Sequence, residues 1–137
     1  MKYKLITLSL TLFLTQPNWA VAPSPTACPE VTAIKEIGAR KAVKSSMMGW
    51  IAYNMKQSYN TPQQWTFSIA GIDAKSEEEA ITKANYVIST LSLQEGPIRG
   101  HKQNEWGCLY VAGSYFALAT TPPDNSPPSM MLSRYIH

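Results

Sequence analysis

The chain has 137 residues and a small excess of positive charge. Twelve Lys and Arg residues face nine Asp and Glu residues, and two of the twelve, Lys2 and Lys4, lie in a predicted signal peptide. The rest of the chain contains no Lys/Arg cluster that would hold a phosphate backbone, so we expect no nucleic-acid partner.

Residues 1–20 are typical of a signal peptide. Two lysines begin the segment, an apolar run from Leu5 to Leu14 follows, and small residues stand near a cleavage position after Ala20. The apolar run is shorter than the roughly 20 residues that a bilayer requires. The sequence therefore predicts a secreted or periplasmic protein that has no membrane span after cleavage and that folds as one domain.

The two cysteines, Cys28 and Cys108, predict one disulfide. An even cysteine count in an exported protein favours pairing, because the compartment is oxidising. Such a bridge closes a long loop and contributes about 4 kcal/mol in the chain-entropy model. Two free thiols are the alternative, whereas a metal site needs more ligands than two distant cysteines supply.

In the first half of the predicted domain, one helix precedes two strands. Residues 21–29 contain three prolines and are expected to form an extended lead-in. Residues 30–40 have apolar side chains at helical spacing, with proline and glutamate at the start. Aromatic and branched residues predict a strand over 48–55, and strict alternation predicts another from residue 65. A hairpin is the expected connection between these strands.

A second helix and two more strands follow. Ser76 and Glu79 form a capping box before an apolar stripe, which predicts a helix over 75–91 lying on a sheet. Residues 92–105 contain Gly96-Pro97 and are expected to form a loop. Strands are predicted over 106–112 and 114–120.

These elements predict an α+β fold over residues 30–121. The order helix-strand-strand-helix-strand-strand favours a small antiparallel sheet of about four strands, with helices on one face and one disulfide. The sequence shows no internal repeat. Residues 122–137 are rich in proline and are predicted to form a flexible tail, because proline does not continue a sheet.

Candidate functional chemistry centres on His101, which stands beside Lys102 in the predicted loop. Nucleophile elbows, phosphate-binding loops and H-E-x-x-H patterns are absent from the sequence, so we expect no enzyme activity. Haem iron accepts histidine as an axial ligand, and cations suit its propionates. The candidate hemin-binding residues are His101, Lys102, Arg99, Trp106 and Tyr110. Simple exposure of His101 on a loop is the alternative.

An aromatic surface is a second possible location for a flat ligand. Its members would be Trp50, Tyr53, Tyr59, Tyr110 and Tyr115. Aromatic residues in a small sheet more commonly form the core, so core positions for these five residues are the alternative.

Several segments together resemble a known family. The segments are "CPEVTAIKEIG", "GW", "WTFSIAGIDAKSEEEAITKAN", "GP" and "WGCLYVAG", followed by "ALATTPP". They are similar to a family of small exported gammaproteobacterial proteins of unknown function, some of which are labelled hemin-binding proteins. The resemblance implies a non-enzymatic small-ligand binder, with hemin capture for iron acquisition as the expected role, and it transfers no ligand residues. The alternative is a secreted or envelope module that binds a host or bacterial protein through its sheet face or C-terminal tail.

Overall fold

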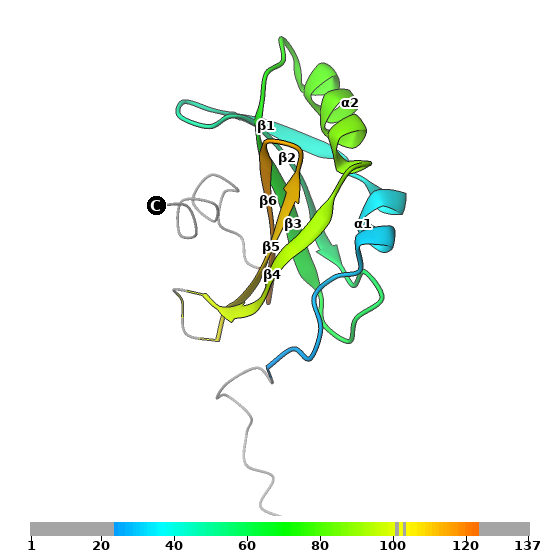
Figure 1. Cartoon of the computed structure of the whole chain (residues 1–137). Helices are drawn as coiled ribbons and strands as arrows, with labels where there is room; N and C mark the ends of the chain where they lie inside the picture. Colours follow the sequence, from blue (N-terminus) through cyan, green and yellow to red (C-terminus); the bar gives the residue numbers. More distant parts are fainter. Residues whose placement is uncertain (1–23, 101, 103, 124–137) are drawn as a thin grey trace, which may run out of the picture.

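The protein forms one six-stranded sheet with two helices, seen in a computed structural model that describes residues 24–100, 102 and 104–123 (Figure 1). The predicted signal peptide, His101 and the predicted tail beyond Pro123 lie outside the described residues. The elements in chain order are α1 (Val31–Ile37), β1 (Lys41–Ser45), β2 (Gly49–Gln57), β3 (Trp65–Ile72), α2 (Glu77–Ile88), β4 (Ser92–Arg99), β5 (Trp106–Ala112) and β6 (Tyr115–Thr121).

The element order repeats, since a helix followed by three strands occurs twice. The sheet order is β1-β2-β3-β6-β5-β4 and every neighbouring pair is antiparallel, so each half is a three-stranded meander and the halves join at β3 and β6. Both helices lie on the same face of the sheet (Figure 1). Helix α2 of the second half packs over β1, β2 and β3 of the first half.

The prediction of about four strands was wrong, because both edge strands were missed. In β1 only Ala42 is buried, while Lys41 and Lys44 are exposed, so the strand carries little apolar signal. Strand β4 contains Gly96-Pro97 and pairs with β5 through two register shifts. Short, charged, bulged or proline-containing edges prevent pairing with other chains, and the same features remove the sequence pattern of a strand.

Gly96 has a structural reason to be glycine. A Cβ atom at this position would lie 2.9 Å from the Cα of Cys108 and 2.9 Å from the Sγ of Cys28, and the backbone φ is +136°. Only glycine allows β4 to pass this closely over the disulfide in that conformation. The residue that indicates a loop in the sequence therefore permits a strand in the fold.

The predicted disulfide is confirmed. Cys28 and Cys108 are bonded, with Cα atoms 5.9 Å apart and a sequence separation of 80, and both are buried. Beside it, the Tyr110 hydroxyl donates a hydrogen bond of 2.6 Å to the Pro29 carbonyl oxygen. Because Pro29 directly precedes the first helix region, these two contacts fasten the start of the first half to β5 of the second half.

Helix α2 begins where the sequence predicts, but the capping box is only half formed. The Ser76 hydroxyl accepts a hydrogen bond of 3.1 Å from the Glu79 backbone N–H. The Glu79 carboxylate instead accepts one of 3.1 Å from the Lys75 backbone N–H, one residue before the predicted donor. The buried stripe of α2 consists of Ala80, Ala84 and Ile88.

Two asparagines hold the segment that leaves α1. The Asn85 side chain accepts a hydrogen bond from the Ala39 N–H at 2.7 Å and donates one to the Ala39 carbonyl oxygen at 3.1 Å. Asn54 does the same for two neighbours, accepting from the Arg40 N–H and donating to the Gly38 carbonyl oxygen. The helix ends at Ile37 rather than near residue 40, because Gly38 has a φ of +67° and the chain then turns onto these amides.

Neither helix in the described ranges is long and apolar enough to cross a membrane.

Candidate functional site

The structure brings Arg99 and Trp106 together. They are directly paired across β4 and β5, and the Arg99 guanidinium carbon lies 5.7 Å from the centre of the Trp106 ring. This distance allows a cation–π contact. Lys102 follows on the connecting segment, where its backbone N–H donates a hydrogen bond of 3.4 Å to the Glu105 carboxylate. His101 lies outside the described residues.

Tyr110 lies apart from this pair, in the interior. Its side chain is fully buried and packs edge-on against Phe67, with ring centres 6.2 Å apart. Burial raises the pKa of the Tyr110 hydroxyl well above its usual range, since the charged form would be poorly solvated. Its hydroxyl already bonds Pro29, so this residue is part of the core around the disulfide.

Most of the possible aromatic surface also belongs to the core. Tyr59 is 2% exposed and meets Phe67 from another side, with ring centres 6.5 Å apart. Trp50 is partly buried and donates a hydrogen bond of 2.8 Å from its indole N–H to the Ala74 carbonyl oxygen. Core packing therefore accounts for three of the five aromatic residues, Tyr110 included.

A groove between α2 and the start of β6 is a candidate site. Its volume is about 690 Å³. One wall comes from α2, whose residues at four-residue spacing lie one above the other on a helix surface. The opposite wall comes from the start of β6 and the end of β3. The lining residues are Asp73, Thr82, Lys83, Tyr86, Val87 and Tyr115.

Two tyrosines give the groove its apolar area. Tyr86 is 81% exposed, an unusual state for a large aromatic side chain. Tyr115 and Val87 are partly buried and pack against the core, which fixes their positions. Tyr115 opens β6 directly after the turn, where Gly113 has a φ of +61°. The groove therefore combines a fixed floor with one exposed ring.

Lys83 supplies a positive charge whose position is defined. Its ammonium donates a hydrogen bond of 2.7 Å to the Asp73 carbonyl oxygen and forms an ion pair of 3.0 Å with the Glu79 carboxylate. The hydrogen bond to Glu79 raises the pKa of the Lys83 ammonium, and the same contact lowers the pKa of the Glu79 carboxyl. Lys83 is thus charged at neutral pH and held at the groove by two partners.

This arrangement suits a flat apolar molecule, because aromatic rings offer planar contact surfaces. An acidic group on the ligand would have to replace Glu79 as the partner of the Lys83 ammonium, and Asp73 also lines the groove. Sequence reasoning missed this site because Tyr86 lies on α2 between residues of the apolar stripe. The available signal was that its position, between Ala84 and Ile88, falls off the buried face of the helix.

Comparison with known proteins places the chain in a family without giving it a function. Neither a curated protein nor a solved structure matches it. A family described as a domain of unknown function, DUF4949, matches residues 27–135. The match includes every described helix and strand. The chain is therefore a member of the DUF4949 family.

Proposed function

We propose that this protein is an exported, non-enzymatic binder of a flat apolar ligand, and that hemin is the ligand. The buried disulfide supports export, because structural disulfides form and persist in oxidising compartments and are rare in the cytosol. The resemblance of the sequence to exported proteins, some labelled hemin-binding, supports the choice of ligand. Iron acquisition is the expected role.

The groove beside α2 is the observation that carries the proposal. Haem iron accepts a tyrosine as axial ligand, and the porphyrin requires apolar contact with cations near its propionates. Tyr86 and Tyr115 supply two phenols and two rings, and Lys83 supplies the cation. A porphyrin lying against Val87 with one propionate at Lys83 would use each of these groups.

The strand end that holds Arg99 and Trp106 is a second location for the same ligand. The Arg99 guanidinium already lies over the Trp106 ring, so a porphyrin stacking there would have to displace it. Tyr110, assigned to this site by the sequence, is buried in the core. For these reasons the groove is placed first, and His101 remains the candidate axial ligand of the second location.

A spectroscopic titration of the protein lacking residues 1–20 tests the proposal and separates the two locations. We expect a saturable, stoichiometric shift of the Soret band. Tyr86→Ala should weaken binding by about ten-fold or more, which corresponds to about 1.4 kcal/mol. Tyr86→Phe should keep the stacking surface but remove any charge-transfer band of iron–phenolate ligation. His101→Ala is the matched control at the other location and should leave the groove titration unchanged.

One outcome would contradict hemin binding, and two would contradict the placement of hemin in the groove. A shift that does not saturate, and that equals the shift given by an unrelated protein, would remove hemin binding altogether. Saturable binding that is lost in His101→Ala and kept in Tyr86→Ala would move the site to the strand end. Binding that both variants retain would place it on neither.

A protein-interaction role receives less support from the sheet edges. Strand addition needs a long, regular and open edge. Here β1 has five residues with two exposed lysines, and β4 has a proline and two register shifts. Both edges therefore resist pairing with another chain, and ligand binding is the better-supported function.

A further inference from the structure

The centre of the sheet face opposite the helices is buried, although no described element lies over it, whereas Val43 and Phe116 on the same face are partly exposed. Alternation along β3 and β6 directs Ser68 and Leu118 to this face, where they pair across the two strands. Ser68 is 0% exposed, Leu118 is 1% exposed, and Ile51 on β2 is 0% exposed. Within residues 24–100, 102 and 104–123, both helices pack on the other face. The described helices therefore do not account for the burial at the centre of this face.

Two hydroxyl groups on the same face lack partners among the described residues. They are Ser68 Oγ and Thr66 Oγ1, both inaccessible to solvent and both on β3. A buried hydroxyl without a hydrogen bond costs about 1–3 kcal/mol, so such groups usually meet a polar partner. An occupant with backbone N–H and C=O groups would supply one, which a purely apolar ligand would not.

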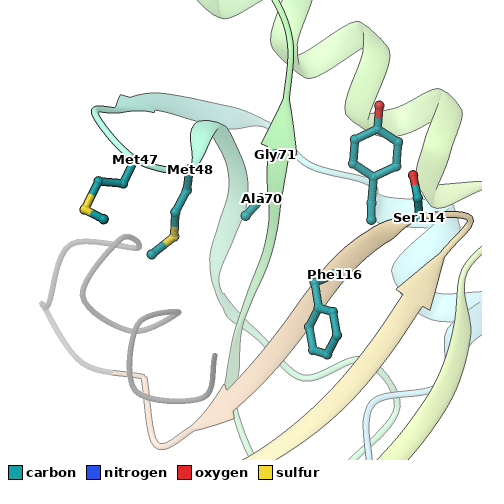
Figure 2. Close-up of a pocket in the computed structure, with 7 residues that line it drawn as sticks. Met47, Met48, Ala70, Gly71, Ser114 and Phe116 are labelled. Carbon is teal, nitrogen blue, oxygen red and sulfur yellow. The ribbon is translucent and has the colours of Figure 1, made fainter. Parts of the chain in front are cut away.

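The buried face ends in a groove that is lined by flexible apolar side chains. Met47 and Met48 lie at the turn between β1 and β2, and Phe116 lies on β6 across from them (Figure 2). The groove measures about 490 Å³, and its walls are completed by Ala70, Gly71, Ser114 and Tyr115. Met47 is 90% exposed there. Methionine adapts to irregular partners, so this groove suits a peptide with apolar side chains.

The C-terminal residues of the same chain have the position and length to reach both features. Strand β6 lies in the middle of the sheet and ends at Thr121, at the end of the face opposite the groove. The seven residues of β6 span roughly 23 Å at strand spacing. Residues 124–137, when extended, span roughly 45 Å and can therefore cross the whole face. Their apolar members are Met130, Met131, Leu132, Tyr135 and Ile136.

The family match points in the same direction. It continues to residue 135, fourteen positions beyond the end of β6. A family domain whose match extends to residue 135 indicates that this segment belongs with the folded unit. We propose that residues 124–137 fold back over the face opposite the helices, with the segment around Met130–Leu132 in the groove of Met47, Met48 and Phe116. This replaces the flexible tail that the proline content predicts.

Photo-crosslinking in the full chain tests the placement without removing any element. A benzoylphenylalanine at position 131 should crosslink to peptides from β2, β3 or β6. The same group at position 78, an exposed position of α2 on the other face, serves as the control and should give no crosslink to residues 124–137. A mixture of ¹⁴N- and ¹⁵N-labelled protein distinguishes a crosslink within one chain from one between two copies. Crosslinks within one chain support the proposal. Crosslinks only between copies, or none to these strands, would overturn it.

Truncation after Pro123 provides an independent measurement. The truncated protein should bind a hydrophobic dye that the full chain excludes, and backbone amides of β3 and β6 should exchange faster. Its Tm should fall by roughly 10 °C, and a peptide of residues 124–137 added in trans should restore it in part. Leu132→Asp should reproduce the loss, whereas Ser126→Asp should not. Unchanged Tm, dye binding and exchange in the truncated protein would refute the proposal.

Discussion

The two halves of the domain repeat one order of elements but hold their helices in different ways. Helix α2 has twelve residues, a serine cap and three acidic residues in its first turn. Helix α1 has seven residues, no side-chain cap and no acidic residue in its first turn. Seven residues are too few for a stable helix by themselves, so tertiary contacts must hold α1. Besides the burial of Ile34 and the hydrogen bonds of Glu30 to the β2–β3 connection, these contacts include the disulfide, Tyr110 and the two asparagines.

The difference shows how the halves depend on each other. Helix α2 covers the strands of the first half, and the residues before α1 are bonded to β5 of the second half. Asn85 then joins the exit from α1 directly to α2. Because α2 covers the first half and the residues before α1 are bonded to β5, we expect the two halves to unfold together unless the ties of α1 are removed.

Removing the disulfide should have the largest effect and should separate the two helices. The double substitution of Cys28 and Cys108 by alanine should lower the free energy of unfolding by about 4 kcal/mol, because the unfolded chain loses its crosslink. Denaturant unfolding measures the loss. Hydrogen exchange should rise in residues 31–37 before it rises in 77–88. Equal acceleration in both helices would contradict the proposed difference in how they are held.

Asn85→Ala should have the next largest effect. It removes two hydrogen bonds from Ala39 and leaves both backbone groups of that residue without this partner, a loss of about 2–3 kcal/mol. Glu78→Ala on an exposed position of the same helix is the control and should change stability by less than about 0.5 kcal/mol. If the two variants unfold at the same denaturant concentration, the hydrogen bonds between Asn85 and Ala39 contribute little to stability.

High pH should weaken the core that the two halves share. Burial raises the pKa of Tyr59 and of Tyr110 well above the ordinary value near 10. The unfolded chain releases the two phenol protons at a lower pH than the folded protein does. The free energy of unfolding therefore keeps its full value below about pH 10 and falls as the pH rises further. The expected loss is about 1.4 kcal/mol per pH unit for each tyrosine.

Denaturant unfolding between pH 9 and pH 11.5 measures this slope. Tyr110→Phe should reduce it by about half, even though the substitution also removes the hydrogen bond to Pro29. A slope that stays unchanged in the Phe variant would show that other groups cause the alkaline loss.

Removing the cap of α2 should have the smallest effect and should be confined to one half. Ser76→Ala deletes the acceptor for the Glu79 N–H and should lower stability by about 1 kcal/mol. Glu30→Ala is the matched change at the start of α1, where the side chain caps nothing, and should cost less than about 0.5 kcal/mol. Thermal unfolding compares the two, and an equal loss would mean that α1 also depends on local capping.

Local signals explain which elements the sequence predicted correctly. Ser76 and the stripe of Ala80, Ala84 and Ile88 locate α2 because capping and helical periodicity act within a few residues. Trp65, Phe67 and Ile69 locate β3 because alternation with a buried face is visible in the chain itself. The pairing of Cys28 with Cys108 required only the count of cysteines and the predicted compartment.

The candidate site was less predictable, because its members come from separate elements. Tyr86 and Tyr115 are 29 positions apart and share a groove only after α2 crosses the first half of the sheet. Arg99 and Trp106 meet because β4 pairs with β5, and β4 itself was expected to be a loop. Tyr110, in turn, points into the core, because its face of β5 is the one that carries the disulfide.

The amino-acid sequence by itself determined the central strands, the capped helix and the covalent link, since each depends on side-chain chemistry at short range or on a single possible pair. Only the tertiary structure decided the two edge strands, the repeat of one helix and three strands, and the packing of α2 over the strands of the first half. Edge strands carry charges, glycine and proline that hide their pattern, and the repeat is one of backbone arrangement rather than of residues. Those features exist only once distant segments pack against one another.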